Sequence, residues 1–582
     1  MLTITSDPYE FASSVTTVAN SDLNNWYALD LETTGLDPQR DKVAIITLAD
    51  NDRHIWIFQT HGYGVSQYLT DFLGRLKLIT QNGTMFDMLF PGMPEVIREH
   101  YDTRIAEAVV APLTPKGALG NAGRANLGEL MRKYCGHNAK LDMPDIGRWT
   151  AAVLEPDQIA YLTADVGYLH AIRHGQWLAA QTHGAAEALD LEMRLTLPVI
   201  RMMRNGIPVS EAAIVKSLAE TQAAAADARR RLSAQFGSKF NPGSPKQVLE
   251  ALKPKHPNLT STDRTALCTL GTQQALDILT VRGANKRNGM FTEEWRSKHI
   301  NDGPMERRYL HTKFNQVGAG TYRFTSSEPN VQQIPKGMRN IVQAEPGYKI
   351  LAIDYQQLEI RWLAAIAYDT DLANALQHTD IHTENAKFVL EHGQTGRSWD
   401  DLSDYEKADM RRKTKGIIFT MGFGGGVTGA VSSAARAGEI LDEQAARDII
   451  QALRSRFPIM AAWIDNKRLE GQAIDLTCIL PFGYQRRWTA TNRSTSSYIN
   501  THVQGTAAIG LKKAILALHG AGLAKHMIMQ VHDELVFHVP EAECTPQFVA
   551  DVCMILQDVM ALPASNGIIG FPVEAALSDI WE

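Results

Sequence analysis

Acidic residues stand at the ends of apolar, strand-like runs in two distant parts of this chain. Asp30 and Glu32 end the first such run, and because residues two apart in a strand point to the same face, both carboxylates converge there. Asp354 ends a second run, and Asp533 lies at a polar turn between two further runs. The chain is therefore expected to place acidic sites at the strand ends of two separate sheets.

Length and composition limit the kind of protein that can carry these two sites. A chain of 582 residues exceeds the size at which one core keeps growing, so at least two domains are expected. It is 44% hydrophobic and 21% charged, and no apolar run approaches the ~20 residues of a membrane span. The N-terminus lacks the features of a secretory signal, which favours a cytoplasmic protein without a membrane partner. The five cysteines form no Cys-x-x-Cys pair, which argues against disulfides and a zinc site.

The hydrophobic pattern changes along the chain and suggests its divisions. Alternating apolar residues predict three strands that form a meander, at 26–31, 43–48 and 54–58. Helical periodicity follows at 155–180, 185–204 and 211–236. The sequence Asn-Pro-Gly-Ser-Pro at 241–245 interrupts the helices. We expect domain boundaries near residues 185 and 315.

The acids of the first site extend beyond the opening strand. Asp87 supplies a third carboxylate, and Tyr161 and Asp165 share one face of a predicted helix at i, i+4. Such acids repel one another unless a cation lies between them, and oxygen ligands of this kind favour Mg²⁺ or Mn²⁺. A solvated strand end or a structural acidic cleft is the simpler alternative. As an ordered set, the residues resemble the three motifs of DnaQ-like proofreading exonucleases, over residues 20–180. The resemblance implies that Asp30, Glu32, Asp87 and Asp165 hold metal and that Tyr161 orients the attacking water.

The second site carries two short motifs, Asp-Tyr-Gln-Gln-Leu-Glu-Ile-Arg at 354–361 and Val-His-Asp-Glu at 531–534. They resemble motifs A and C in the palm of family A DNA polymerases. The resemblance implies that Asp354 and Asp533 hold two ions of Mg²⁺ or Mn²⁺ for phosphoryl transfer, as in the two-ion exonuclease site. It also places Tyr355 at the nucleotide and makes Glu359 a steric gate against ribonucleotides.

A helical stripe between these motifs carries two cations followed by two aromatic rings. Arg411, Lys415, Phe419 and Phe423 recur every four residues, a spacing that allows one end to hold triphosphate and the other to contact sugar and base. A surface helix with an apolar end is the alternative. The stretch resembles the family's motif B, but Ile418, Thr420 and Phe423 depart from its Asn, Gly and Tyr.

Several polar residues are implied as DNA contacts by the same resemblance. Donors in the minor groove test pair geometry without reading sequence, because purine N3 and pyrimidine O2 are both acceptors. The segments 321–335 and 500–508 resemble family segments of this kind, which implies DNA contacts by Arg323, Asn500 and Gln504, with His532 at the primer terminus. In the first segment Tyr322 replaces the family's Gly.

A basic strip could hold the phosphates of a duplex. Eleven basic and five acidic residues lie between Arg282 and Arg339, although the whole chain has a net charge of −6 and a solvated basic face is the alternative. The strip includes Arg282 and Lys286, and it follows a segment at 240–247 that resembles the family's thumb.

Taken together, the resemblance implies a mixed α/β and α+β multidomain chain. An RNase H-like 3′-5′ exonuclease domain at 1–185 would precede a right-hand polymerase with a thumb at 186–315 and a palm and fingers at 316–582, the fingers at roughly 365–480. Primer-template DNA and deoxynucleoside triphosphates are the expected partners, and a processivity factor, helicase or primase could join them. Too few residues precede Asp30 for a 5′ nuclease domain, which favours a phage-like replicase. A polymerase body that only binds and trims DNA, and a single-subunit RNA polymerase, are the alternatives.

Overall fold

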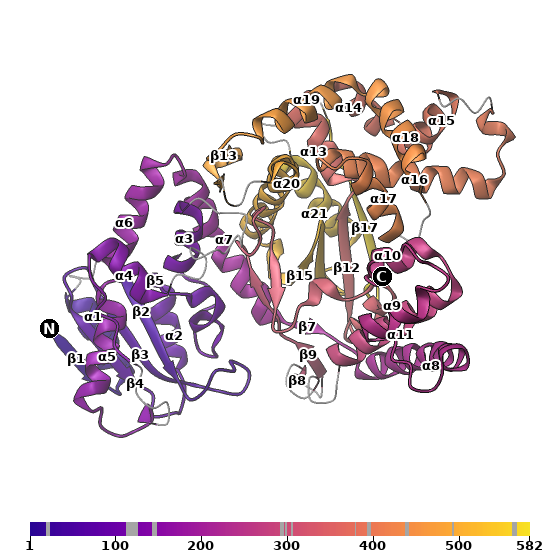
Figure 1. The fold of residues 1–582 in the computed structure, drawn as a ribbon. Coiled ribbons are helices and arrows are strands. Elements are labelled where there is room, and N and C mark those ends of the chain that lie inside the picture. The colour runs from indigo at the N-terminus through magenta and orange to yellow at the C-terminus, as the bar shows by residue number, and fades with distance from the viewer. Residues whose placement is uncertain are drawn as a thin grey trace.

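A computed structural model gives the fold of the chain (Figure 1). It describes residues 1–18, 24–111, 126–142, 148–291, 296, 300–303, 307–378, 380–392, 397–436, 441–489, 491, 494–560, 567 and 569–582. A mixed sheet with its helices lies at one side of Figure 1, and a larger body with a second sheet lies at the other. Among the helices of the described ranges, none is long and apolar enough to cross a membrane.

The N-terminal domain is built on a six-stranded sheet in the order β1-β4-β3-β2-β5-β6. The strands β2, β3 and β4 form the predicted antiparallel meander, while β1 pairs parallel with β4 and β5 pairs parallel with β2 and β6. The strand bounds are β1 Leu2–Thr5, β2 Trp26–Thr33, β3 Val43–Ala49, β4 Ile55–Gln59, β5 Lys77–Thr80 and β6 Glu99–Asp102. This mixed sheet is the RNase H-like arrangement that the sequence predicted.

Helices cover both faces of this sheet, because its strands are apolar on both sides. One core joins α1 and α2 to residues such as Leu29 and Leu31, and the other joins α3–α6 to residues such as Ala28 and Ile45. The helix bounds are α1 Pro8–Val18, α2 Gln67–Gly74, α3 Thr103–Val110, α4 Leu127–Cys135, α5 Pro156–Gly167 and α6 Leu169–Thr182. The single helix predicted at 155–180 is thus two helices, α5 and α6, which meet at Tyr168.

A long helix, α7 (Ala186–Asn205), links the two parts of the molecule. It packs on β6 and α3 of the first domain and on α20 (Thr495–Gly520) and β15 (Met527–Val531) of the second. The helices that follow form a separate arm with its own core. They are α8 Glu211–Phe236, α9 Pro245–Leu252, α10 Arg264–Leu270 and α11 Gln273–Met290.

The larger body is centred on a four-stranded antiparallel sheet in the order β15-β16-β12-β17. Its other strands are β12 Tyr348–Tyr355, β16 Glu534–Pro540 and β17 Val573–Ser578. The predicted apolar run before Asp354 is β12, and the predicted pair of runs around Asp533 is the β15–β16 hairpin. The helix α13 (Leu358–Ala367) begins just after β12 and packs against α20.

A helical lobe stands above this sheet in Figure 1. It contains α14 Thr370–His378, α15 Ile381–His392, α16 Asp404–Gly422, α17 Val427–Arg436, α18 Glu443–Arg456 and α19 Pro458–Glu470. The arm helix α10 packs against α17, so the arm and the lobe meet on one side of the sheet. Two small antiparallel pairs are β10 (Lys313–Asn315) with β11 (Thr325–Ser327), and β13 (Leu476–Ile479) with β14 (Gln485–Trp488). A three-stranded antiparallel sheet has the order β7-β9-β8, with β7 Ile207–Pro208, β8 Ile300–Gly303 and β9 Arg307–Leu310, and α21 (Pro546–Val559) packs on α20 and β17.

Candidate active sites

The first acidic site forms where β2 meets a short helical turn and α5. Asp30 and Glu32 lie on β2, and the backbone N–H of Leu31 between them donates a 3.1 Å hydrogen bond to Oδ1 of Asp87. Asp165 on α5 completes the group, because α5 packs directly on β2 and β3. The structure therefore brings together the four predicted carboxylates, which the sequence separates widely.

Burial and mutual repulsion make this group an unfavourable place for negative charge. Desolvation, followed by the charges of Asp165 and Asp87, raises the pKa of Glu32 to about 8. Desolvation raises the pKa of Asp87 to about 7, although backbone hydrogen bonds oppose it. Burial and the three neighbouring acids raise the pKa of Asp30 well above its usual value. A divalent cation would relieve this repulsion, so the carboxylate donors fit Mg²⁺ or Mn²⁺.

A lysine and a tyrosine flank the acids. The Lys140 ammonium donates to Oδ2 of Asp165 at 3.2 Å and lies 5.5 Å from the centre of the Tyr161 ring. The Tyr161 hydroxyl also donates to Asp165, and burial raises the pKa of this phenol. Sequence reasoning missed Lys140, since an isolated lysine in a loop carries no pattern; only the fold places it beside the acids.

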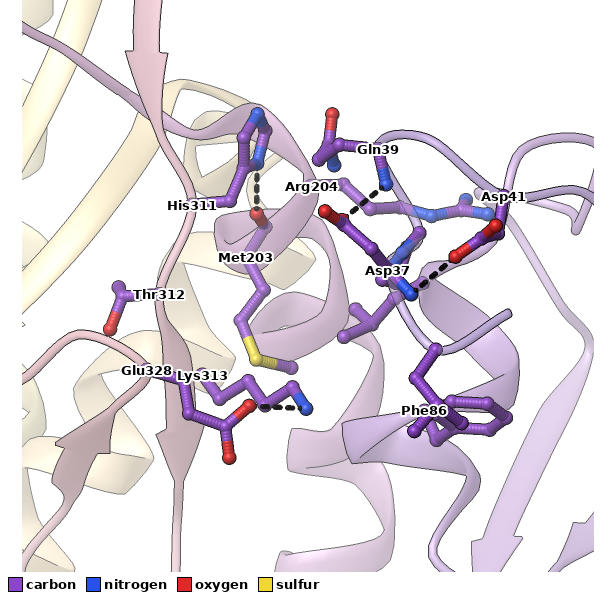
Figure 2. Close-up of a pocket in the computed structure, with 13 residues that line it drawn as sticks. Asp37, Gln39, Asp41, Phe86, Met203, Arg204, His311, Thr312, Lys313 and Glu328 are labelled. Atoms are coloured by element: carbon purple, nitrogen blue, oxygen red, sulfur yellow. Dashed lines mark hydrogen bonds and ion pairs between the residues drawn. The ribbon is translucent and has the colours of Figure 1, made fainter. Parts of the chain in front are cut away.

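A cavity of about 580 Å³ opens beside this site, between the N-terminal domain and the larger body (Figure 2). Its N-terminal wall includes Leu36 and Phe86, the latter adjacent to Asp87, and its other wall includes His311 and Lys313. Lys313 forms a 2.8 Å ion pair across the β10–β11 region with Glu328. The lining combines apolar and aromatic surface with two cations, Arg204 and Lys313, and three acids, Asp37, Asp41 and Glu328.

The second acidic site lies where β12 meets the β15–β16 hairpin. Asp354 is paired with Glu534 in the register of β12 and β16, and the Tyr355 N–H donates to the Asp533 carbonyl at 3.4 Å. Desolvation raises the pKa of Asp533 to about 7, with Glu359 and Asp354 adding to the effect against the opposing charge of Arg323. Burial also raises the pKa of Asp354. The two predicted carboxylates thus share one charged, partly buried edge.

Arg323 connects this acidic edge to Glu359, the residue predicted to exclude ribonucleotides. A guanidinium nitrogen of Arg323 donates to Oε1 of Glu359, and the same nitrogen lies 3.8 Å from Oδ1 of Asp533. The Glu359 side chain is only 12% exposed. Arg323 therefore holds Glu359 in place and partly neutralises Asp533.

Two residues near the edge are engaged elsewhere. The Glu534 carboxylate accepts from Trp581 Nε1 at 2.8 Å and pairs with Arg339 at 3.2 Å. The Tyr355 hydroxyl donates to the Leu556 carbonyl at 2.7 Å, and only 4% of the residue is exposed. The structure therefore turns the Tyr355 side chain into the core and away from the two aspartates.

The predicted nucleotide stripe lies along α16. Arg411 donates to Oδ2 of Asp380 at 3.1 Å, while Lys415 is exposed. Phe419 and Phe423 are half-buried, with ring centres 6.3 Å apart, and Phe423 caps the end of the helix. The stripe therefore presents its cations and rings in the order that the sequence predicted.

A histidine beside this stripe was missed by sequence reasoning. His382 on α15 is 3% exposed, and its ring centre lies 6.2 Å from that of Phe419. Among the described residues, neither ring nitrogen has a hydrogen-bond partner. Burial and the charges of Lys415 and Arg411 lower its pKa to about 4. His382 is therefore a neutral, buried ring behind the stripe, and a lone histidine in a helix carries no sequence signal.

The predicted DNA contacts fall in two groups. In the larger body, Asn500 and Gln504 lie one turn apart on α20, and Oδ1 of Asn500 is buried with no partner in the described part of the chain. His532 is exposed at the tip of the β15–β16 hairpin. On the arm, Lys286 is exposed, whereas Arg282 donates to the Pro242 carbonyl at 2.7 Å and so braces a loop. Lys298 of the basic strip lies outside the described residues.

Comparisons with known proteins agree with this arrangement. Residues 4–177 match the family described as 3'-5' exonuclease, and residues 212–582 match DNA polymerase family A. The chain is 27% identical to DNA polymerase I of Pseudomonas aeruginosa over 610 aligned residues, which cover 95% of this chain and 63% of that protein. It is 33% identical to the thermostable DNA polymerase I of Thermus thermophilus over 250 residues, or 40% of this chain and 28% of the relative.

A solved structure shares the fold over the whole chain. It is the POL domain of Pol1 from M. smegmatis in complex with DNA primer-template and dNTP, with a TM-score of 0.77 and 18% sequence identity. The match covers 99% of each chain. The chain therefore spans one complete polymerase-domain structure but about 63% of the length of the Pseudomonas relative.

Proposed function

Since the chain belongs to DNA polymerase family A and carries a 3'-5' exonuclease domain, we propose that it extends DNA primers on a template and proofreads them. The observation that carries this proposal is the presence of two separate carboxylate groups, one in each matched region. We assign the exonuclease domain to 1–185, the thumb to 186–315, and the palm and fingers to 316–582, with the fingers at roughly 365–480. Primer-template DNA and deoxynucleoside triphosphates are the proposed substrates.

Domains of these two families generally use divalent metal ions, and we propose two Mg²⁺ or Mn²⁺ ions in each site. In the palm, Asp354 and Asp533 would hold them, and when bound the ions activate the primer 3′-hydroxyl and neutralise the triphosphate. Arg411 and Lys415 would bind triphosphate oxygens, since both cations lie on one stripe of α16, and the buried, neutral His382 packs behind them near Phe419. Phe419 and Phe423 would contact sugar and base.

DNA contacts are proposed at both sites. Arg323, Asn500, Gln504 and His532 would contact the primer end, and Lys286 would contact duplex phosphate. For Arg282 the structure favours a bracing role, because its guanidinium already binds loop carbonyls. In the exonuclease site Asp30, Glu32, Asp87 and Asp165 would hold metal, and Tyr161 would orient the attacking water.

A primer-extension assay with Mg²⁺ tests the proposal directly. Wild type is mixed with a matched or a mismatched primer terminus, with and without deoxynucleotides, and products are resolved by length. We expect extension of the matched primer, and trimming before extension of the mismatched one. Wild-type protein that binds the DNA but neither extends nor trims it, at any salt or metal concentration, would contradict both assignments.

Glu359 is expected to exclude ribonucleotides. Its carboxylate is held by Arg323 and is mostly buried, so it forms a fixed wall against a sugar 2′-hydroxyl. Glu359→Ala should raise ribonucleotide incorporation relative to deoxynucleotide by about tenfold or more, which equals at least ~1.4 kcal/mol of discrimination. Glu359→Gln keeps the bulk and the hydrogen-bonding oxygen, and it should retain most of the selectivity. An unchanged ribonucleotide ratio in Glu359→Ala, measured by single-nucleotide incorporation, would remove the gate assignment.

Phe419 is expected to favour discrimination against dideoxynucleotides. A dideoxynucleotide lacks the sugar 3′-hydroxyl and the contact that this hydroxyl makes. A tyrosine hydroxyl at this position could replace that contact, whereas Phe419 has no hydroxyl. Phe419→Tyr should therefore lower the preference for deoxynucleotides over dideoxynucleotides by about tenfold or more. A tenfold change corresponds to ~1.4 kcal/mol, which is about the free energy of one hydrogen bond. Chain-termination ratios for wild type and variant measure this. Equal incorporation of both nucleotides by the wild type would refute it.

A further inference from the structure

Tyr322 occupies a backbone position that favours glycine. Its φ is +59°, in the left-handed region that side chains rarely adopt, and the segment it belongs to has Gly here in the family pattern. Yet the residue is 0% exposed, so the large side chain is fully packed. A tyrosine kept in this conformation indicates that its side chain makes contacts a glycine could not.

The Tyr322 side chain anchors its loop to the β13–β14 hairpin. Its hydroxyl donates a 2.5 Å hydrogen bond to the Gln485 carbonyl, and its ring meets the Tyr484 ring edge-on with centres 4.7 Å apart. The buried Lys512 ammonium lies 5.6 Å from the same ring and pairs with Glu192 of α7. One end of the loop is therefore tied to the hairpin and to α20.

The same hairpin holds the loop at a second point and connects it to α20. A Cβ built on Gly320 would lie 2.9 Å from the Arg486 guanidinium carbon, so the arginine rests directly on the loop backbone. Arg486 also donates to Oγ1 of Thr501 at 2.7 Å. Thr501 stands where the family pattern has Ala, and it is next to Asn500. The loop and the proposed DNA-binding face of α20 thus share one buried support.

The anchored loop is the segment that presents Arg323. The Tyr322 N–H donates to the Ala319 carbonyl at 2.9 Å, and the Ala319 N–H donates to the Arg323 carbonyl at 3.3 Å, which closes a tight turn. From that turn the Arg323 guanidinium reaches Glu359 and lies 3.8 Å from Asp533. A shift of the turn would move the guanidinium away from both acids.

We infer that Tyr322 is a positioning residue for Arg323, replacing the glycine of the family pattern with an anchor that sets Arg323 at the polymerase site. The inference rests on the proposed polymerase activity. Because Tyr322 is 0% exposed, it would act through Arg323 and not by direct contact with substrate. It should therefore affect the rate of extension more than the affinity for nucleotide, which the proposal assigns to α16.

Steady-state extension by Tyr322→Gly and Tyr322→Phe tests this inference. Glycine suits the backbone but removes the anchor, so we expect kcat to fall roughly 10- to 100-fold, the scale of a misplaced catalytic group, with KM for nucleotide within about twofold of wild type. Tyr322→Phe keeps the ring contacts and should retain most of the wild-type kcat. Trimming of single-stranded DNA by the same preparations should stay at the wild-type rate, which shows that the exonuclease domain is folded, and the unchanged KM for nucleotide shows that the polymerase body is folded.

Tyr368→Gly is the matched control. Tyr368 also has a left-handed backbone, with φ +57°, but it is 61% exposed at the end of α13 and lies outside this junction. It should extend primers at the wild-type rate. Wild-type kcat in Tyr322→Gly, or losses of extension and trimming in equal proportion, would overturn the inference. A wild type that trims but does not extend would instead refute the proposed polymerase function on which the inference rests.

Discussion

Asp533→Ala is expected to abolish primer extension while trimming continues. Asp533 adjoins the end of β12, where the Tyr355 N–H donates to its carbonyl, and burial with the charges of Glu359 and Asp354 raises its pKa to about 7; the proposal assigns it, with Asp354, to the divalent cations. A missing metal ligand costs several kcal/mol of transition-state stabilisation, and ~4 kcal/mol corresponds to a loss of about a thousandfold in rate. Rapid-quench extension of a matched primer measures the loss. The exonuclease carboxylates lie in another domain, so the variant should still degrade the primer.

An acid at the far end of the same sheet provides the control for Asp533. Asp579 follows β17, its side chain is 75% exposed, and it pairs with Lys349 at 2.8 Å. Asp579→Ala should change extension by less than about twofold, because exposed ion pairs contribute at most ~1 kcal/mol to stability. Extension by Asp533→Ala at more than a tenth of the wild-type rate would show that this residue is not a metal ligand.

The sequence predicted best where chemistry and local pattern coincide. An acid at the end of an apolar run predicted both the strand β12 and the position of Asp354, and the fold agreed. The helix predicted at 211–236 is α8, which has the same bounds. Its sequence is a long Ala- and Arg-rich stretch, and the Ser210 side chain caps its first turn, so the start of the helix is well defined. By contrast, β1 and α1 were not predicted, since the four-residue β1 becomes a strand only by pairing with β4.

Residues that act through distant contacts could not be read from the sequence. Lys140 and His382 became candidates only when the fold placed them beside Asp165 and Phe419. The same limit applies to the predicted role of Tyr355, whose motif position says nothing of the hydrogen bond its hydroxyl makes to Leu556. A motif gives the residue type at a site, whereas the direction of a side chain depends on the elements packed around it.

A double substitution in the first domain is expected to abolish trimming while primer extension continues, which is the reverse of the result expected for Asp533→Ala. Asp30→Ala with Glu32→Ala removes the two acids of β2. The rate of trimming of single-stranded DNA should fall at least about a thousandfold, which corresponds to ~4 kcal/mol of transition-state stabilisation lost with the metal ligands. Primer extension should persist. Mismatched termini, which the wild type is proposed to remove, should then remain in the products. Sequencing of extended products and a trimming time course measure both effects.

A matched pair of acids tests whether this loss is specific to the site. Asp50 and Asp52 are also two residues apart and lie at the turn between β3 and β4, where Asp50 bonds His54. Asp50→Ala with Asp52→Ala should leave trimming within about twofold of wild type. The Glu32 carboxylate is buried and that of Asp30 is half-buried, and they repel each other and their neighbours, so their removal should also raise the melting temperature in a chelating buffer. Lost trimming with a lowered melting temperature would instead indicate that the two acids support the fold of the domain.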